Sequence, residues 1–184
     1  KKTALSEFSR PRSVGLRALE LEEGDFLVGT AITNGSCEAL LISSAGKAVR
    51  FREGDVRAMG RTARGVRGIR LAQGQRVISL IVPQPGARLL TASEHGYGKR
   101  SDIDEFPTKG RGTKGVISMR ASERNGTQVS AVLVRPEDEI MVITVGGTLV
   151  RTAVAGIPIH SRDTQGVRLI NLGEGERVAY VERI

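Results

Sequence analysis

The sequence of 184 residues is poor in cysteine and in aromatic residues, with one Cys, no Trp, four Phe and two Tyr. The single Cys37 cannot form a disulfide within the chain, which excludes disulfide-stabilised secreted folds. With no basic-then-apolar leader, the sequence predicts a reducing, cytoplasmic location. So few rings also disfavour a platform that stacks single-stranded bases. No apolar run approaches the roughly 18–20 residues of a membrane span, so we expect no membrane association.

Helical periodicity is lacking as well, because no long segment places apolar residues at i, i+3, i+4 and i+7. The chain instead contains 23 glycines, several of them at a fixed period. Gly15, Gly65, Gly115 and Gly166 stand 50, 50 and 51 residues apart, and each opens a stretch with alternating apolar residues. Alternation with a period of two indicates β-strands. The sequence therefore predicts a β unit that repeats about every 50 residues.

Two further registers repeat with the same period. Arginine occurs at positions 50, 100 and 151, and glycines at positions 24, 74, 126 and 175 each precede a short apolar strand, the first at residues 26–28. Four strands in a unit of about 50 residues are typical of a propeller blade. We therefore expect an all-β fold, a β-propeller or β-pinwheel, represented here by roughly four blades.

The predicted units divide residues 1–184 into 1–49, 50–99, 100–150 and an incomplete 151–184. They form a single domain in this interpretation. Because a propeller usually needs about four to eight blades to close, we expect the chain to be a fragment of a larger subunit that completes the ring.

The net charge of +8 is unevenly placed along each unit. The four segments 1–17, 46–70, 95–120 and 146–172 together carry +15, and the remaining residues carry −7. Equivalent parts of successive blades lie at equivalent places around a propeller, so a charge that repeats with the period becomes a basic band. Such a band suits the phosphate backbone of duplex DNA, which is bound with little dependence on base sequence.

The candidate DNA-binding residues are the basic side chains of this half of the repeat: Lys1, Lys2, Arg10, Arg12, Lys47, Arg50, Arg61, Arg64, Lys99, Arg100, Lys109, Arg111, Lys114, Arg151 and Arg162. The alternative for each is a solvated surface charge. A second alternative for the whole chain is a protein-interaction propeller, in which the basic rim or the acidic loop at residues 137–139 contacts a protein partner.

Motifs for catalysis or cofactor binding are weak. Residues 110–115 have the glycine spacing of a dinucleotide-binding loop, but a predicted strand follows them, so no helix N-terminus would hold a pyrophosphate. His95 and His160 have no Cys or carboxylate partner at metal-ligand spacing. We therefore expect no catalytic residue, no metal site and no cofactor in this chain.

Several strings are specific enough to suggest a family. Together they closely resemble the C-terminal domain of the bacterial DNA gyrase A subunit; the strings are residues 57–61 (RAMGR), 65–71 (GVRGIRL), 79–83 (SLIVP), 96–100 (GYGKR), 107–109 (PTK) and 113–118 (TKGVIS). The C-terminal domain of the topoisomerase IV A subunit is the nearest relative with the same blades and remains an alternative.

This resemblance implies a six-bladed β-pinwheel, in which neighbouring blades exchange strands and duplex DNA wraps around a basic perimeter with one hand. The parent would be an ATP-dependent type II topoisomerase that introduces negative supercoils, located with the nucleoid in the cytoplasm. Its ATP and Mg²⁺ would be used elsewhere in an A2B2 complex of the gyrase A and B subunits, and the isolated domain would be monomeric. The family's basic, glycine-rich box of the first blade is not found in this sequence, so the chain resembles the last four blades.

Overall fold

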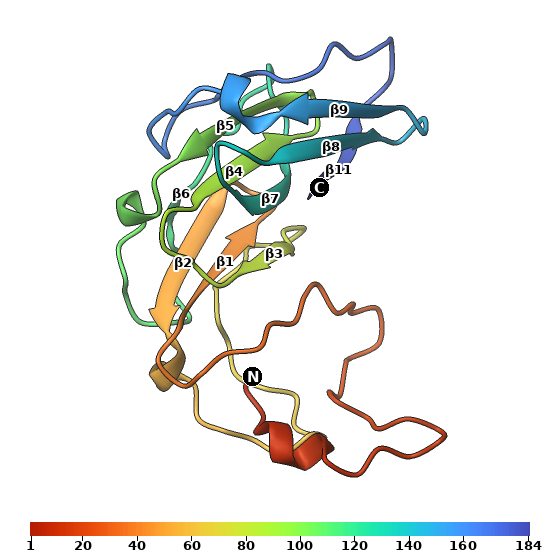
Figure 1. Cartoon of the computed structure of the whole chain (residues 1–184), viewed down its shortest axis with the longest axis vertical. Coiled ribbons are helices and arrows are strands. Elements are labelled where there is room, and N and C mark those ends of the chain that lie inside the picture. Colours follow the sequence, from red (N-terminus) through yellow and green to blue (C-terminus); the bar gives the residue numbers. More distant parts are fainter.

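The computed structural model describes residues 1–184 and is built almost entirely from short antiparallel strands (Figure 1). All four helices are 3-10 segments of three or four residues, and none is long enough to cross a membrane. The elements are η1 (Leu5–Phe8), β1 (Glu38–Ser43), β2 (Lys47–Arg52), η2 (Glu53–Asp55), β3 (Val77–Ile81), β4 (Arg88–Ser93), β5 (Tyr97–Ser101), η3 (Ile103–Glu105), β6 (Val116–Ile117), β7 (Gln128–Val134), β8 (Glu139–Thr144), β9 (Leu149–Ala153), η4 (Val154–Gly156), β10 (Val167–Arg168) and β11 (Val178–Arg183).

Three β-hairpins form the centre of the repeat. They are β1–β2, β4–β5 and β8–β9, and each turn contains a glycine with positive φ, at Gly46 (68°), Gly96 (80°) and Gly147 (86°). Only glycine adopts this backbone conformation without a steric penalty, which explains the recurrence of glycine at each hairpin. A 3-10 turn follows the second strand of every hairpin.

Neighbouring sheets exchange strands. We name them blade A (order β3-β1-β2-β6), blade B (β7-β4-β5-β10) and blade C (β11-β8-β9). Strand β6 lies in sequence between β5 and β7 of blade B, yet it pairs with β2 of blade A. Likewise, β10 lies between β9 and β11 of blade C but pairs with β5 of blade B. Blades A and B have the four strands expected of a blade and blade C has three, and the strand exchange expected of a pinwheel is confirmed.

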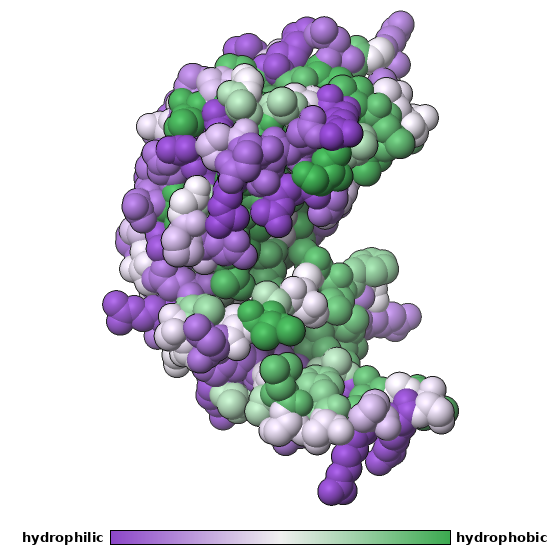
Figure 2. Space-filling view, viewed as in Figure 1, coloured by the Kyte–Doolittle hydropathy of each residue, from purple (hydrophilic) through white to green (hydrophobic).

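The blades form an open arc. Blade A lies in the middle of Figure 1, blade C at one end, and the N-terminal coil at the other. In blade A, β6 lies on the convex side and β3 on the concave side. Figure 2 shows the resulting crescent: its convex edge is largely hydrophilic, and hydrophobic surface borders the concave side.

Two hydrophobic clusters hold successive blades together. Leu40 and Ile42 of blade A pack with Leu89 of blade B and with the fully buried Phe106. The next cluster joins blade B to blade C in the same way, for example through Leu90 and Ile140. Because the cores lie between blades, burial of apolar surface sets the face-to-face packing of the sheets.

The strand expected at residues 26–28 is wrong. No strand forms before Glu38, and Phe26 is 84% exposed. The equivalent strand β3 pairs with β1, where Leu80 faces Leu41, a residue 39 positions earlier in the sequence. A hairpin at that separation from residues 26–28 would precede Lys1, so the segment has no strand to pair with among these 184 residues.

Candidate nucleic-acid interface

The repeated arginines occupy equivalent positions in the fold. Isolated parallel bridges join Lys2 to Ala58, Arg50 to Thr108 and Arg100 to Ile159, so the three basic residues share one register. Each stands three residues before the start of a 3-10 turn, and Arg151 stands at the same distance from η4. The predicted period is therefore present in three dimensions.

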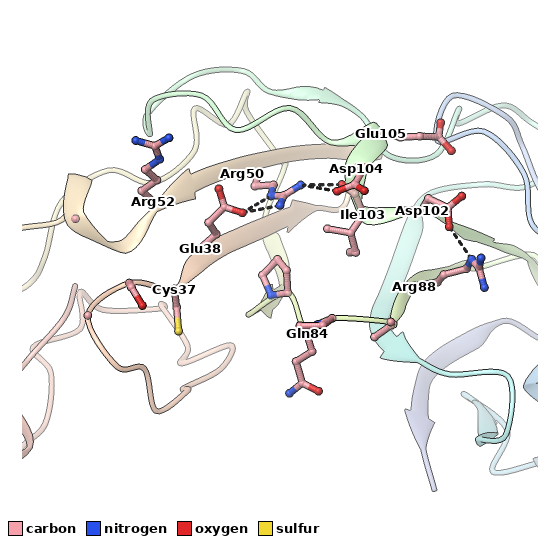
Figure 3. A pocket seen from close by; sticks show the side chains of 17 residues that line it. Cys37, Glu38, Arg50, Arg52, Gln84, Arg88, Asp102, Ile103, Asp104 and Glu105 are labelled. Atoms are coloured by element: carbon pink, nitrogen blue, oxygen red, sulfur yellow. Dashed lines mark hydrogen bonds and ion pairs between the residues drawn. The ribbon is translucent and has the colours of Figure 1, made fainter.

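Arg50 uses this position to hold the next blade. Its Nη1 donates to the carbonyl oxygens of Ile103 (2.9 Å), the first residue of the η3 turn, and of Phe106 (3.1 Å), which follows that turn. Its Nε donates to Glu38 Oε2 at 2.8 Å, and Asp104 lies 4.0 Å away (Figure 3). Its side chain is only 15% exposed. These contacts occupy the guanidinium within the protein.

Arg100 makes the same kind of contact from blade B to blade C. It is buried, its Nε donates to the carbonyl oxygen of Ile157 at 2.6 Å, and its Nη2 donates to Ala155 at 3.4 Å. Lys2 donates to the carbonyl oxygen of Glu53, the first residue of η2, at 3.1 Å. We call these contacts of Lys2, Arg50 and Arg100 the interblade latch.

Arg151 occupies the position equivalent to Arg50 and Arg100, but no turn of a following blade is present to accept its hydrogen bonds. Its side chain is 64% exposed and contacts only Glu139, as Arg50 contacts Glu38 at the same spacing of 12 residues. The acceptor turn of the next blade has no counterpart within the 184 residues. A basic residue at this position of the repeat therefore contacts a neighbouring blade only where that blade is present.

A second repeated contact uses Arg61, Arg111 and Arg162. The Nη1 of each donates to the carbonyl oxygen two residues after a repeat glycine: Arg17 (3.1 Å), Arg67 (3.1 Å) and Ile117 (2.9 Å). The arginines thereby tie each peripheral loop to the segment after the repeat glycine of the preceding unit, which is the exchanged strand β6 in the case of Ile117. Hydrogen bonds from a charged donor stabilise such a junction more than neutral ones do.

Lys99 lies in the interior. It is fully buried, and its Nζ donates to the carbonyl oxygen of Ser161 at 2.6 Å and to Ser101 Oγ at 3.3 Å. Burial lowers the pKa of Lys99 to about 8, partly offset by Glu105 and Asp163. Lys1 makes the equivalent contact at the surface, where its Nζ donates to Gly60 and Arg61 carbonyl oxygens. In this conformation, Lys99 and Arg100 are not available to a phosphate.

The other candidate residues remain accessible. Arg10, Arg12, Lys109 and Lys114 are exposed and form no side-chain hydrogen bond or ion pair. Lys47 is half-buried and also has no side-chain partner. Arg64 is 62% exposed, although it pairs with two acidic side chains, Glu20 (3.3 Å) and Glu22 (3.2 Å).

Four further exposed arginines follow the repeat glycines and were not among the predicted DNA-binding residues. Arg67 and Arg168 stand two residues after a repeat glycine, and Arg70 and Arg120 stand five residues after one. Their spacing was a readable signal in the sequence. Arg168 lies in the exchanged strand β10, and the other three lie in coil after a repeat glycine, so all four add exposed positive charge to the basic half of the repeat.

An open groove of about 1190 Å³ lies between the hairpins of blades A and B (Figure 3). Its charged side chains neutralise one another, since Arg50 contacts Glu38 and Arg88 donates to Asp102 at 2.6 Å. No three His, Cys, Asp or Glu side chains gather as a group that could hold a metal ion. The groove therefore offers neither a net positive site for a phosphate nor a metal site.

The architecture and the sequence match a known family. A family described as the DNA gyrase C-terminal domain, beta-propeller, matches residues 1–34, 38–84, 87–135 and 138–184. The chain belongs to this family. The matched segments follow the predicted period of about 50 residues, and the last three start at the hairpins, 12 or 13 residues before the predicted unit boundaries.

Relatives of this gyrase-family chain include the DNA gyrase A subunits of Pseudomonas aeruginosa and of Salmonella typhimurium, both 55% identical over all 184 residues. The relative from Escherichia coli K12 is 53% identical. The chain spans only about a fifth of the length of these relatives, 20–21%.

Two solved structures have the same fold. A DNA gyrase A C-terminal domain aligns over 93% of this chain and 58% of its own length, with a TM-score of 0.84 and 26% identity. The C-terminal domain of DNA topoisomerase IV aligns over 99% and 57%, with a TM-score of 0.91 and 25% identity. The fold is thus similar to both, while the sequence is much more similar to the DNA gyrase A subunits.

Proposed function

We propose that this chain binds duplex DNA along its convex perimeter and wraps it, as a non-catalytic module of a DNA gyrase A subunit. The observation that carries the proposal is the exposed basic band. Once the residues of the interblade latch are set aside, Arg10, Arg12, Lys109 and Lys114 have no side-chain partner within the protein, and the exposed arginines that follow the repeat glycines accompany them. Unpartnered cations along a curved edge neutralise phosphates and offset the cost of bending DNA.

The parent protein in this proposal is an ATP-dependent type II topoisomerase that introduces negative supercoils in the bacterial cytoplasm. The wrapped DNA would be presented to the gyrase B subunit, and to the remainder of the A subunit, in an A2B2 complex. ATP and Mg²⁺ would act elsewhere in that complex, and we assign no step of their chemistry to the residues of this chain. The 53–55% identity to DNA gyrase A subunits supports this choice over topoisomerase IV.

Duplex affinity measured across a salt series tests the proposal. The logarithm of the binding constant should fall with the logarithm of salt concentration by about 0.9 for each phosphate contact. The triple variant Arg70→Gln, Lys109→Gln, Lys114→Gln should therefore bind more weakly and with a shallower slope.

A control variant removes the same charge from partnered cations. Arg135 donates to the carbonyl oxygen of Pro85 (3.2 Å), Arg177 lies 4.0 Å from Glu94, and Arg183 lies 3.7 Å from Asp138. Replacing these three arginines by Gln should leave the slope nearly unchanged. Equal slopes for wild type and both variants would contradict DNA binding on the perimeter and favour a protein partner.

A further inference from the structure

Tyr97 lies at a junction between two units. It is the first residue of β5 in blade B, is 5% exposed, and pairs in the ladder with Arg168 of the exchanged strand β10. Arg168 Nη2 donates to the phenol oxygen at 2.9 Å, and the guanidinium carbon lies 5.5 Å from the ring centroid. The buried ring therefore holds a side chain that is itself exposed.

A second arginine lies over the same ring. The guanidinium carbon of Arg124, from the exposed loop before β7, is 4.7 Å from the centroid of Tyr97. Cation–π contacts of this length are attractive and orient the guanidinium. The two guanidinium groups are thus positioned at one phenol from two different units of the chain.

No carboxylate neutralises this pair. Neither Arg124 nor Arg168 takes part in any of the nine ion pairs of the structure; the only other side-chain acceptor is Asn171 Oδ1, 3.3 Å from Arg168. Both arginines lower the pKa of Tyr97, because they favour the charged phenolate over the neutral phenol. Two converging cations without a counter-charge are stabilised when an anion binds between them.

The arrangement occurs once in the chain. The position equivalent to Tyr97 is Lys47 in blade A, where it pairs with Ile117 of β6, and Thr148 in blade C. An aromatic ring that carries two arginines is therefore a property of blade B alone and not of the repeated basic band.

We propose that Tyr97, Arg124 and Arg168 form a discrete anion subsite that takes one phosphodiester of duplex DNA, with Tyr97 as the positioning residue. The non-bridging oxygens of the phosphodiester accept hydrogen bonds from the two guanidinium groups. This inference rests on the proposed DNA binding and adds a fixed point to it: the DNA backbone passes over the junction of β5 and β10.

The first experiment compares salt slopes. The double variant Arg124→Gln, Arg168→Gln should lower the magnitude of the log–log slope by about one, the change expected for a single phosphate. The control Arg135→Gln, Arg183→Gln removes the same charge and should leave the slope unchanged. Equal slopes for the two double variants would overturn the subsite.

The second experiment uses Tyr97 as its own reporter. The chain has two tyrosines and no tryptophan, so Tyr180→Phe leaves Tyr97 as the only phenol that titrates. A bound phosphodiester neutralises the two arginines and should raise the pKa of Tyr97, measured from phenolate absorbance with and without a saturating duplex. A Tyr97 pKa that does not change on binding would overturn the proposal, since a merely structural tyrosine would not respond to DNA.

The wild-type chain separates the two proposals. If it shows no salt-dependent affinity for duplex DNA, the proposed function fails and the subsite fails with it. If it binds duplex normally while Arg124→Gln, Arg168→Gln binds with the wild-type slope, the subsite alone fails. Tyr97→Phe keeps the ring but removes the hydroxyl that holds Arg168, and we expect weaker binding than wild type.

Discussion

Arg100 in blade B donates its Nε hydrogen to the carbonyl oxygen of Ile157, which follows the η4 turn of blade C, at 2.6 Å. The side chain of Arg100 is buried, and Ile157 is 3% exposed. A basic residue that repeats with the period of the fold is therefore a joint between blades at this position. Its charge contributes to the stability of the arc rather than to the exposed basic band.

We predict that Arg100→Met destabilises the chain. The substitution retains much of the apolar stem but leaves the carbonyl oxygen of Ile157 without its charged donor, which costs about 1.5–3 kcal/mol. Urea unfolding of the variant should show this loss in the free energy of unfolding.

Arg151→Met is the matched control for this prediction. Arg151 has the same register, but its side chain is 64% exposed and contacts only Glu139. An exposed ion pair contributes at most about 1 kcal/mol, so we expect a small effect. Equal destabilisation by both variants would show that the latch contact does not matter.

Two of the repeat glycines, Gly115 and Gly15, offer a second pair of matched variants. Gly115 has φ of 74°, and a Cβ placed there would lie 2.2 Å from the carbonyl oxygen of Ala48, whereas Gly15 has φ of 77° and no atom within 4 Å. Gly15→Ala should cost at most about 1–2 kcal/mol from backbone strain. Gly115→Ala must also separate β2 from the start of β6, so its unfolding midpoint in urea should fall considerably further. Similar midpoints would contradict the exchanged-strand packing.

Because of the buried Lys99, we predict that the free energy of unfolding depends on pH. Its pKa is lowered to about 8 in the folded chain from 10.5. The unfolded chain therefore binds more protons between these pH values, and the free energy of unfolding should rise as the pH increases from about 8 towards 10.5. Chemical unfolding at several pH values measures this rise.

Lys99→Met should abolish the part of the rise that belongs to Lys99, and the exposed Lys109→Met should retain it. The equivalent positions Val49 and Val150 are apolar, so the register itself tolerates an apolar side chain. A wild-type curve that stays parallel to that of Lys99→Met throughout this range would contradict the burial of a titrating ammonium group.

The sequence predicted the period and the strands because glycine is required wherever the backbone turns with positive φ or two strands approach closely. Gly115 and Gly166 meet both conditions, since each lies against a backbone carbonyl of a neighbouring strand. These requirements are local and recur in every unit, so they are readable from spacing alone.

The contacts of the basic residues could not be predicted in this way. Arg50 and Arg151 have the same register and the same carboxylate 12 residues earlier, yet only Arg50 meets the turn of a following blade. The difference depends on whether a neighbouring blade is present, which spacing does not record. For the same reason, residues 26–28 have strand-like sequence without forming a strand.

Wrapping is tested most directly by relaxing a closed circular plasmid with a topoisomerase I in the presence of the 184-residue chain, and then removing the protein. The account predicts a retained linking-number change of a single sign that grows with the ratio of protein to DNA, because DNA that follows a curved basic perimeter is wrapped with one hand. Saturating binding to the plasmid with no retained linking-number change would contradict it.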